Sequence, residues 1–306
     1  MIIVGGEALV DLVVDPDGAV AAKLGGGPFN SARTVGRLGS DVAFLGALSR
    51  DRFGTLLHNQ LLADHVDDSL VQFTELPTTL ASAELDERGA ASYRFYISDT
   101  AAPNLYPLPF PEPVSILHVG TLGLVLEPMA STLETIVRDV SDDILVLLDP
   151  NCRPRVTPDR VGYLARLGRM LRRADVVKVS TDDLDFIAPD DHSAGIRDLL
   201  EGGASLVLHT DGGRSVQVHW PAGEPAIVPV PAVEVVDTIG AGDSFGGAFA
   251  AWWDQAGLGR DDLGDRDAVR SAVEAAVEVS AVNCCRVGAQ PPHRDELGEK
   301  WRPARP

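Results

Sequence analysis

The feature that most constrains the fold of this chain is the alternation of short apolar runs with longer amphipathic stretches. The apolar runs have the length of strands, and their continuous hydrophobicity is typical of strands buried on both faces of a sheet. Because parallel strands are joined by long and usually helical crossovers, this alternation predicts an α/β fold with a mostly parallel central sheet covered by helices on both faces. The expected strands are 2–4, 42–45, 116–119, 144–148, 176–179 and 206–209, and the expected helices lie near 28–38, 52–64, 128–140, 159–173, 193–201, 241–254 and 268–285.

Two stretches interrupt this alternation and predict a second, smaller sheet. Residues 11–24 and about 69–98 contain β-rich runs without a helical pattern, and residues 87–89 have the composition of a hairpin tip. We expect a small antiparallel sheet that forms a lid over a cleft in a single domain spanning residues 1–306. An edge hairpin and an oligomer contact are the alternative interpretations, and the outer face of this sheet is a candidate surface for a homodimer. Residues 288–306, rich in proline and charge, are expected to form a terminal extension.

The net charge excludes some partners. The 26 Lys and Arg residues face 45 Asp and Glu residues, which gives a formal charge of −19. Such a chain does not hold nucleic acid or an anionic membrane through bulk attraction. A small anion such as ATP can still bind, because backbone N–H groups or a metal ion hold it locally.

The cellular location is also an expectation from the sequence. No apolar run has the length of a membrane span, and the first residues lack a charged targeting region. The three cysteines are an odd number without metal-binding spacing, which is typical of buried thiols in a reducing compartment. We therefore expect a soluble cytoplasmic protein.

The glycine clusters do not fit the two commonest nucleotide motifs. A Walker A loop needs Gly-Lys-Ser/Thr, and none of the three lysines follows a glycine. The dinucleotide fingerprint GxGxxG fails at its last position in both residues 25–30 and residues 240–245. The sequence therefore disfavours a P-loop enzyme and a Rossmann oxidoreductase.

Residues 237–245 (DTIGAGDSF) carry the strongest chemical signal. They follow a strand-like run at 233–236 and open an amphipathic helix, and Asp243 lies on the side of that helix opposite its apolar face. Gly240 and Gly242 permit a tight turn that leaves N–H groups uncovered at the positive helix end. An acid in a first turn can simply cap the helix dipole. Beside an anion nest, however, a carboxylate suits phosphoryl transfer, because it can accept the proton of an attacking hydroxyl.

The same segment also matches the nucleophile motif of serine hydrolases. Residues 242–246 fit GxSxG, which requires the serine at a sharp turn directly after a strand. The strand-like run ends eight residues before Ser244, and the only later histidine, His293, lies in the terminal extension. This pattern disfavours a hydrolase.

A second glycine cluster indicates a binding site for a polar ligand. In residues 25–32 (GGGPFNSA), glycines and a proline precede a helix whose first turn contains Asn30. The amide of Asn30 offers donors and an acceptor, which suits sugar hydroxyls, although a routine helix entry has the same composition. Asp11 comes just beyond a strand end, where open α/β sheets bind ligands.

Taken together, these segments resemble the ribokinase-like, or PfkB, family of carbohydrate kinases. Residues 25–54 and 237–244 are similar to the two family signatures in content, order and separation. The resemblance implies a ribokinase-like fold with a β lid and ATP-dependent, Mg²⁺-assisted phosphorylation of the hydroxymethyl group of a small sugar. It implies Asp243 as the base, Gly240, Ala241 and Gly242 as the anion hole for the γ-phosphate, and Asp11, Gly26, Gly27 and Asn30 as the sugar site.

Further matches extend this resemblance to the nucleotide. Residues 149–153 (DPNCR) look like a fructokinase segment in which Arg153 faces substrate or phosphate, with a surface ion pair as the alternative. Residues 210–213 (TDGG) are similar to the nucleotide loop of the family, and the family lines its adenine pocket and monovalent-cation site late in the chain. The resemblance therefore implies nucleotide contacts for Thr210, Gly212 and Asn283, and a K⁺ ion near Asp237 and Gly288.

One segment departs from the family pattern. Where the family usually shows Asn-x-x-Glu, which organises magnesium and phosphate, this chain has Ser180 and Asp183. Asp183 can still act on magnesium through water, but Ser180 is shorter and lacks the amide. The departure puts metal affinity and turnover in question, and it leaves open a weakly catalytic sugar- or nucleotide-binding protein of kinase ancestry.

The sequence narrows the choice of sugar without fixing it. Residues 6–11, 93–101 and 149–153 look fructokinase-like, which makes fructose the first choice. A 2-keto-3-deoxygluconate kinase is the second alternative and a nucleoside kinase the third.

Overall fold

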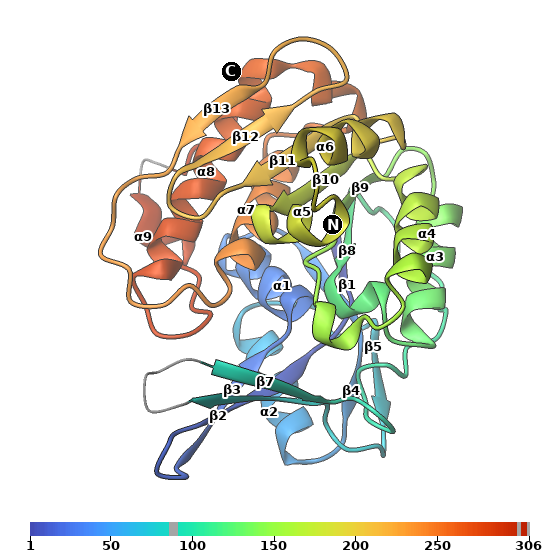
Figure 1. Ribbon diagram of the computed structural model, residues 1–306, viewed down its shortest axis with the longest axis vertical. Helices are drawn as coiled ribbons and strands as arrows, with labels where there is room; N and C mark the ends of the chain where they lie inside the picture. The colour runs from blue at the N-terminus through green and yellow to red at the C-terminus, as the bar shows by residue number, and fades with distance from the viewer. Residues whose placement is uncertain (86–90, 299–300, 305–306) are drawn as a thin grey trace.

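The computed structural model describes residues 1–85, 91–298 and 301–304, and its centre is a twisted sheet (Figure 1). The strands of this main sheet are β1 (Ile2–Gly5), β4 (Val42–Ser49), β5 (Val71–Thr74), β8 (Ile116–Gly120), β9 (Leu145–Asp149), β10 (Val176–Ser180), β11 (Leu206–Thr210), β12 (Ser215–His219) and β13 (Ala226–Pro229). Their order is β13-β12-β11-β10-β9-β8-β1-β4-β5. The strands from β11 to β5 are parallel, and β12 and β13 add an antiparallel edge that the sequence did not indicate.

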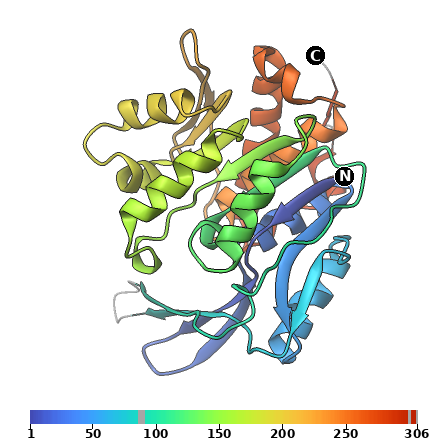
Figure 2. The same ribbon diagram turned by 90° about the vertical axis from the view of Figure 1, so that its right-hand side faces the viewer.

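Helices cover both faces of the main sheet, as the alternation predicted (Figure 2). On β1, Ile2 and Val4 pack in one apolar cluster and Ile3 in the other, because successive strand residues point to opposite faces. One face is covered by α1 (Gly27–Arg37), α2 (Arg52–Ala63), α7 (Ala241–Gln255) and α8 (Arg266–Cys284), and the other by α3 (Met129–Asp139), α4 (Arg160–Leu171), α5 (Thr181–Ile187) and α6 (His192–Glu201). The short helices are η1 (Thr121–Leu124), η2 (Pro154–Val156), η3 (Arg260–Gly264) and α9 (Arg294–Leu297).

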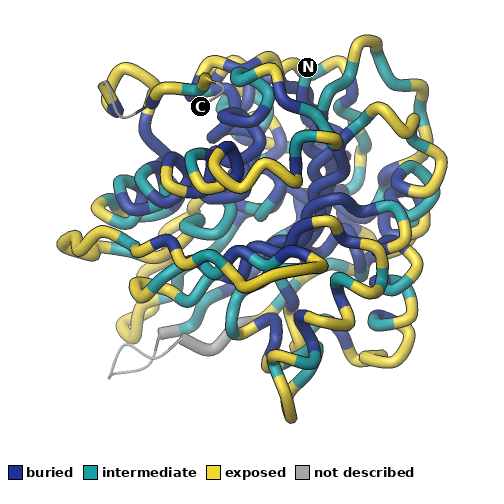
Figure 3. The backbone as a smooth tube through the Cα atoms, turned by 90° about the horizontal axis from the view of Figure 1, so that it is seen from above, coloured by how far each residue is buried: buried dark blue, intermediate teal, exposed yellow. Residues whose placement is uncertain are grey.

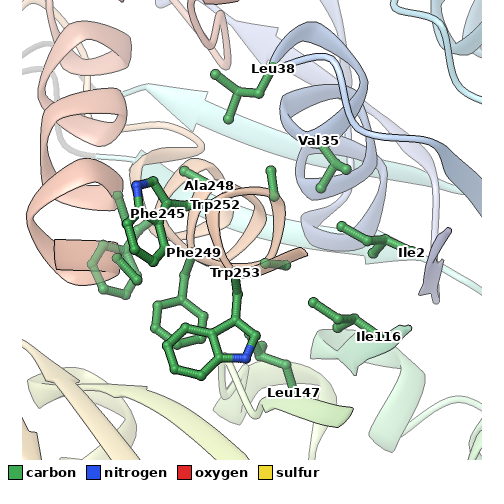
Figure 4. Packing of buried hydrophobic residues seen from close by; sticks show 14 of the residues in the cluster. Ile2, Val35, Leu38, Ile116, Leu147, Phe245, Ala248, Phe249, Trp252 and Trp253 are labelled. Atoms are coloured by element: carbon green, nitrogen blue, oxygen red, sulfur yellow. The ribbon is translucent and has the colours of Figure 1, made fainter. Parts of the chain in front are cut away.

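The rotation of α7 about its axis is fixed by its apolar face. Phe245, Ala248, Phe249, Trp252 and Trp253 are each at most 2% exposed, and they meet side chains of α1 and the central strands (Figure 4). The rings of Phe249 and Trp253 stack with centroids 5.6 Å apart. This packing confirms the predicted apolar face, and it holds the first turn of α7 in a defined orientation.

A separate small sheet lies beside the main one, below it in Figure 1. Its order is β3-β2-β6-β7, and β2 pairs with β6 in parallel and with β3 antiparallel. Its strands are β2 (Leu9–Val14), β3 (Val20–Gly25), β6 (Leu80–Leu85) and β7 (Ala91–Tyr96). The turn at residues 6–8 joins β1 directly to β2, so this sheet starts next to the carboxyl end of the main sheet.

The boundaries expected for the lid were partly wrong. The segment expected at 69–98 begins with β5, which pairs in parallel with β4 and forms the edge of the main sheet. Its composition does not distinguish the two sheets, because Val71–Thr74 is β-rich in either. The first segment starts at Leu9 rather than at residue 11. The expected hairpin tip at 87–89 lies outside the described residues.

Two other expectations were wrong for physical reasons. Residues 233–236 form no strand, because the backbone N–H groups of Val236 and Asp237 bond to the carbonyl of Cys284 instead of a neighbouring strand. The terminal stretch 288–306, where it is described, packs on the domain instead of extending from it, since Leu297 and Trp301 are buried against the core. Figure 3 shows the buried backbone concentrated in the central strands and the helices against them. In the part of the chain that is described, no helix has the length and apolarity to cross a bilayer.

Candidate active site

Helix α7 begins at a tight backbone turn. Its N-cap residue Gly240 is left-handed with φ 74°, and no side chain caps the helix. The first turn of a helix leaves N–H groups without an intrahelical acceptor, and the helix dipole makes this end positive. The N–H groups of Gly242 and Asp243 therefore suit an anion such as a phosphoryl group. Ser244 is fully buried inside α7, so residues 242–246 form no exposed nucleophile elbow.

Two polar side chains hold the loop that precedes α7. Asp237 accepts hydrogen bonds from the N–H groups of Ile239 (3.0 Å) and Gly288 (2.8 Å). The buried amide of Asn283 donates to the carbonyl of Ile239 (2.9 Å) and accepts from the N–H of Gln290 (2.7 Å). Both residues thus tie the loop before Ala241 to the segment after α8 and shape the turn.

Asp243 lies next to the second glycine cluster. Its Oδ2 accepts a hydrogen bond from Nδ2 of Asn30 (2.9 Å), and its carbonyl accepts one from the hydroxyl of Ser31 (3.1 Å). Burial raises the pKa of Asp243, and this effect is opposed by the bond from Asn30 and by the charges of Lys178 and Arg153. The residues of the two motifs, 213 positions apart in the chain, form one site.

The first helical residue of α1, Gly27, faces the same carboxylate. A Cβ atom at Gly27 would lie 2.5 Å from Oγ1 of Thr121 and 3.2 Å from Oδ1 of Asp243. The N–H of Gly27 donates to Oε1 of Glu7 (3.1 Å), and Gly26 is the N-cap of the helix. A side chain at position 27 would fill the space in front of Asp243, so glycine is needed for close approach.

Two further carboxyl groups crowd the site. Glu7 is 1% exposed, and burial raises its pKa to about 8. Burial also raises the pKa of Asp11, on β2, to about 6. For both groups the charge of Asp243 adds to the increase and the charge of Arg153 opposes it, which shows that all four lie within electrostatic range. The sequence singled out Asp11 but not Glu7, whose only signal was an acid directly after a buried strand.

The ends of β8 and β9 carry backbone strain. Thr121 and Asn151 have positive φ angles of 56° and 39°, and Nδ2 of Asn151 donates to Oγ1 of Thr121 (3.3 Å). Arg153, which is exposed, donates to Oδ1 of Asn151 (2.7 Å). Strained non-glycine residues cluster at functional sites, where the surrounding structure holds them in place.

The segment that departs from the family pattern forms a helix cap. Ser180 is the N-cap of α5, and Oδ2 of Asp183 accepts from both the N–H and the hydroxyl of Ser180 (2.7 Å each). Oδ1 of Asp183 accepts from the N–H of Cys152 (2.5 Å). Asp183 thus fastens the end of β10 to the loop after β9. Helix α5 was missed in the sequence because its acidic first turn resembled a metal segment.

No protein cage for a metal is visible at these strand ends. Within residues 1–85, 91–298 and 301–304, no three His, Cys, Asp or Glu side chains are grouped to hold an ion. Magnesium commonly binds through one or two carboxylates, waters and substrate phosphates rather than through a full set of protein ligands. A magnesium ion that arrives with a nucleotide needs no such group of side chains.

The remaining expected nucleotide contacts lie on the neighbouring strand. Thr210 ends β11, and its hydroxyl donates to the carbonyl of Val179 (3.4 Å). Gly212 lies in the turn that joins β11 to β12. Among the described contacts, none joins these two residues, Ser180 or Asp183 directly to Asp243.

A buried lysine at the site was missed as well. Lys178 on β10 is 3% exposed and donates to both carboxylate oxygens of Asp149 (3.0 and 3.2 Å). The only signal in the sequence was a charged residue inside an apolar strand, Val176–Ser180.

Comparison with known proteins agrees with this geometry. Residues 1–296 match the family described as pfkB family carbohydrate kinase. A fructokinase of Rhizobium leguminosarum bv. trifolii is 34% identical over 259 residues, which cover 82% of this chain and 79% of the relative.

Solved structures agree over nearly the whole chain. The fructokinase of Xylella fastidiosa with bound ATP matches with a TM-score of 0.88 and 30% identity, over 97% of this chain and 96% of that one. The fructokinase of Vibrio cholerae O395 in its fructose-, ADP- and calcium-bound form matches with a TM-score of 0.85 and 27% identity, over 98% of each chain. The predicted ribokinase-like fold and the ATP-dependent sugar kinase activity are thereby confirmed, and the chain belongs to the pfkB family of carbohydrate kinases.

Proposed function

We propose that this sugar kinase phosphorylates fructose on a hydroxymethyl group. The similarity to fructokinases, including one structure described with fructose and ADP, supports the choice of sugar. The observation that carries the chemistry is the contact between Asp243 and Asn30 at the start of α7, because it joins an acid, an anion site and a polar sugar-binding amide.

Asp243 acts as the general base in this proposal. It accepts the proton of the attacking hydroxyl, and a carboxylate with a raised pKa is a stronger base than an ordinary one. The backbone at Gly240, Ala241 and Gly242 faces the transferred phosphoryl group and stabilises its charge at the positive end of α7.

The sugar is held in front of that acid. Asn30 and Asp11 bond its hydroxyls, and Gly26 and Gly27 let it approach the backbone. Arg153, at the strained end of β9, faces the sugar or the phosphate.

The nucleotide occupies the neighbouring strand ends. Thr210 and Gly212 contact ATP, and Ser180 and Asp183 lie toward its phosphates. Asn283, which is buried, acts on the site through the loop before Ala241 that it holds.

When bound with ATP, Mg²⁺ would neutralise phosphate charge, and Asp183 would act on it only through water, because both of its carboxylate oxygens already accept hydrogen bonds from Ser180 or Cys152. A K⁺ ion binds near Asp237, whose loop precedes the anion hole; the double-mutant fructokinase of Vibrio cholerae O395 is described with a potassium ion.

The small sheet is the lid, and its outer face is the homodimer surface. Val20 on β3 is 58% exposed and Tyr96 on β7 is 53% exposed, which leaves apolar area for a second copy. Use of ATP and three free cysteines are what we expect of a cytoplasmic enzyme.

The test is coupled ADP release with Mg-ATP over a panel of sugars. The panel contains fructose, ribose, 2-keto-3-deoxygluconate, tagatose 6-phosphate and adenosine, with Asp243→Asn as the control. We expect turnover with fructose that falls by roughly 10²- to 10⁴-fold in Asp243→Asn, which keeps its fold and ATP binding.

Each other outcome has a defined meaning. Turnover only with 2-keto-3-deoxygluconate or adenosine contradicts the choice of fructose but leaves the kinase mechanism intact. Near wild-type kcat in Asp243→Asn contradicts the role of that residue. No turnover with any compound of the panel, with ATP still bound, supports the alternative of a weakly catalytic sugar- or nucleotide-binding protein of kinase ancestry.

A further inference from the structure

Lys178 lies directly beneath the anion hole. A Cβ atom at Gly242 would be 2.9 Å from Nζ of Lys178 and 3.6 Å from its Cε. The first turn of α7 therefore lies against the lysine side chain, and a side chain at position 242 would require the ammonium to shift. Asp149 holds the ammonium there through two hydrogen bonds.

The surroundings of Lys178 are unusually acidic. Burial alone would lower its pKa, but the carboxylates of Asp149, Asp183 and Asp243 keep the pKa of Lys178 above its ordinary value. The ammonium is therefore charged at any working pH. His118, also buried nearby, stays neutral, because burial and the charge of Lys178 lower its pKa to about 3.

A purely structural role explains this arrangement poorly. A positive charge at the amino end of a helix is unfavourable, because that end of the helix dipole is already positive. A buried ion pair also adds little stability compared with apolar side chains of the same volume. The positive end of the α7 dipole and the ammonium of Lys178 thus both lie next to Gly242, and an anion bound above Gly242 would be attracted by both.

We propose that Lys178 is a positioning residue for phosphoryl transfer: its ammonium, fixed under Gly242 by Asp149, strengthens the anion hole and keeps the carboxylate of Asp243 ionised. The lysine reaches the reacting atoms only through Gly242 and Asp243. The inference rests on the proposed kinase chemistry of this site and adds a residue that neither family signature contains.

The pKa of Asp243, and with it the pH dependence of kcat, depends on the charged groups that face Asp243. These groups are Lys178 on β10, Asp149 at the end of β9, Arg153 after it, Glu7 after β1 and Asp11 on β2. A base works only when it is deprotonated, so kcat falls as pH drops through its pKa. Removing Lys178 raises that pKa and moves the acidic limb to higher pH. Removing Asp149 lowers it and moves the limb to lower pH.

The test compares wild type with Asp149→Asn and with the double variant Lys178→Met/Asp149→Asn. The two variants differ from each other only in the lysine, because both lack the Asp149 charge. The double variant removes both partners of the buried pair and leaves no unpaired buried ammonium, so we expect it to fold with a Tm near that of wild type. The control is Arg260→Met/Asp175→Asn, which removes an ion pair at the amino end of β10 and also takes Asp175 from Arg173, so it is compared for kinetics and binding and not for Tm.

At the pH where kcat is maximal, we expect the kcat of the double variant to lie about tenfold below that of Asp149→Asn. KM for fructose should change less than about threefold. The acidic limb of the pH profile of kcat lies at higher pH in the double variant than in Asp149→Asn. The control pair changes neither the plateau kcat nor the acidic limb. The same plateau kcat and the same limb in the double variant and in Asp149→Asn would overturn the proposal.

A binding measurement separates this inference from the choice of sugar. Calorimetry without sugar gives the ratio of ATP to ADP affinity, and only ATP carries the phosphoryl group that faces the hole. We expect this ratio to fall severalfold in the double variant and to stay constant in the control. An unchanged ratio contradicts the role of Lys178, whether or not any sugar in the panel is phosphorylated. Absence of turnover with every sugar, with the ratio changed as expected, would contradict only the proposed substrate.

Discussion

Buried carboxylates at the two ends of the neighbouring strands β9 and β10 have different kinds of partners. At the amino end, Asp175 is 3% exposed and has a partner for both oxygens: the N–H of Val146 (2.7 Å), Arg173 (3.1 Å) and Arg260 (2.7 Å). At the carboxyl end, Asp149 is equally buried, but its single cation, Lys178, is shared with other acids.

The carboxyl end also carries unpaired groups. Four buried atoms there lack a hydrogen-bond partner within the described residues: Oε2 of Glu7, Oδ1 of Asn30, Nδ1 of His118 and Oγ of Ser244. Burial raises the pKa of Asp149 to about 7 despite the neighbouring lysine. Unsatisfied polar atoms, raised pKa values and positive φ angles each cost stability, and all three kinds occur together at this end, whereas the amino end of β10 has one unpaired buried atom among the described residues, Nε of Arg173.

This difference in the partners of the buried carboxylates indicates which end of the sheet is under functional constraint. A carboxylate with its own cations and a backbone N–H fastens strands and loops, whereas several carboxylates crowded around one shared lysine are poised to bind something absent from the chain itself. The ligand supplies the missing hydrogen bonds and charges. Variants at the amino end should therefore change stability alone, and variants at the carboxyl end should change both stability and activity.

The largest expected effect is on stability, at the amino end. Asp175→Asn leaves Arg173 and Arg260 without their shared counter-charge and should lower the free energy of unfolding by about 3–5 kcal/mol. Because the site lies at the other end of the strands, kcat with fructose should stay within about twofold of wild type. Urea unfolding and coupled ADP release measure the two. A large loss of kcat in folded Asp175→Asn would break the division between the ends.

A smaller effect, with a pH signature, is expected at Glu7. Its pKa is raised from 4.5 to about 8 in the folded protein, so its contribution to stability is full below about pH 4.5 and is lost as pH rises toward 8. Glu7→Gln cannot ionise. Relative to wild type it should gain roughly 2–4 kcal/mol of unfolding free energy between about pH 5 and pH 8.

The control for Glu7 is an exposed glutamate on α8. Glu274→Gln should leave the pH dependence of unfolding as in wild type. Urea unfolding at several pH values gives both curves. If Glu7→Gln and Glu274→Gln had parallel curves, Glu7 would be ionised in the folded protein, and the carboxyl end would be less strained than its geometry indicates.

The main architecture could be predicted from the sequence because buried parallel strands are apolar throughout. Every expected strand and helix of the alternation is present, with ends shifted by a few residues. The edge strands were harder. Val71–Thr74 could belong to either sheet, β12 alternates polar and apolar residues, and β13 is only four residues long.

The site could be predicted only where local sequence and chemistry coincide. Gly240 and Asp243 share one helix start, so their roles follow from a single motif. Glu7 and Lys178 acquire meaning only when the sheet brings β1 and β10 to one edge, because each is an isolated charge in an apolar run. The capping role of Asp183 was hidden for the opposite reason: an acid in a helix's first turn suits a cap and a metal equally well.

The smallest expected effect concerns space in front of Asp243. Gly27→Ala adds a methyl group 2.5 Å from Oγ1 of Thr121 and 3.2 Å from Oδ1 of Asp243, so one of these side chains must shift. Because small displacements of reacting groups are costly, kcat/KM for fructose should fall about tenfold or more, with little change in ATP affinity. The matched control is Gly168→Ala in α4, where a Cβ atom meets nothing within 4 Å. That variant should gain about 0.5–1 kcal/mol of stability and keep its kcat. Equal kcat/KM in the two variants would mean that the sugar hydroxyl does not occupy the space between Gly27 and Asp243, and the carboxyl end would lose its place as the reacting end of the sheet.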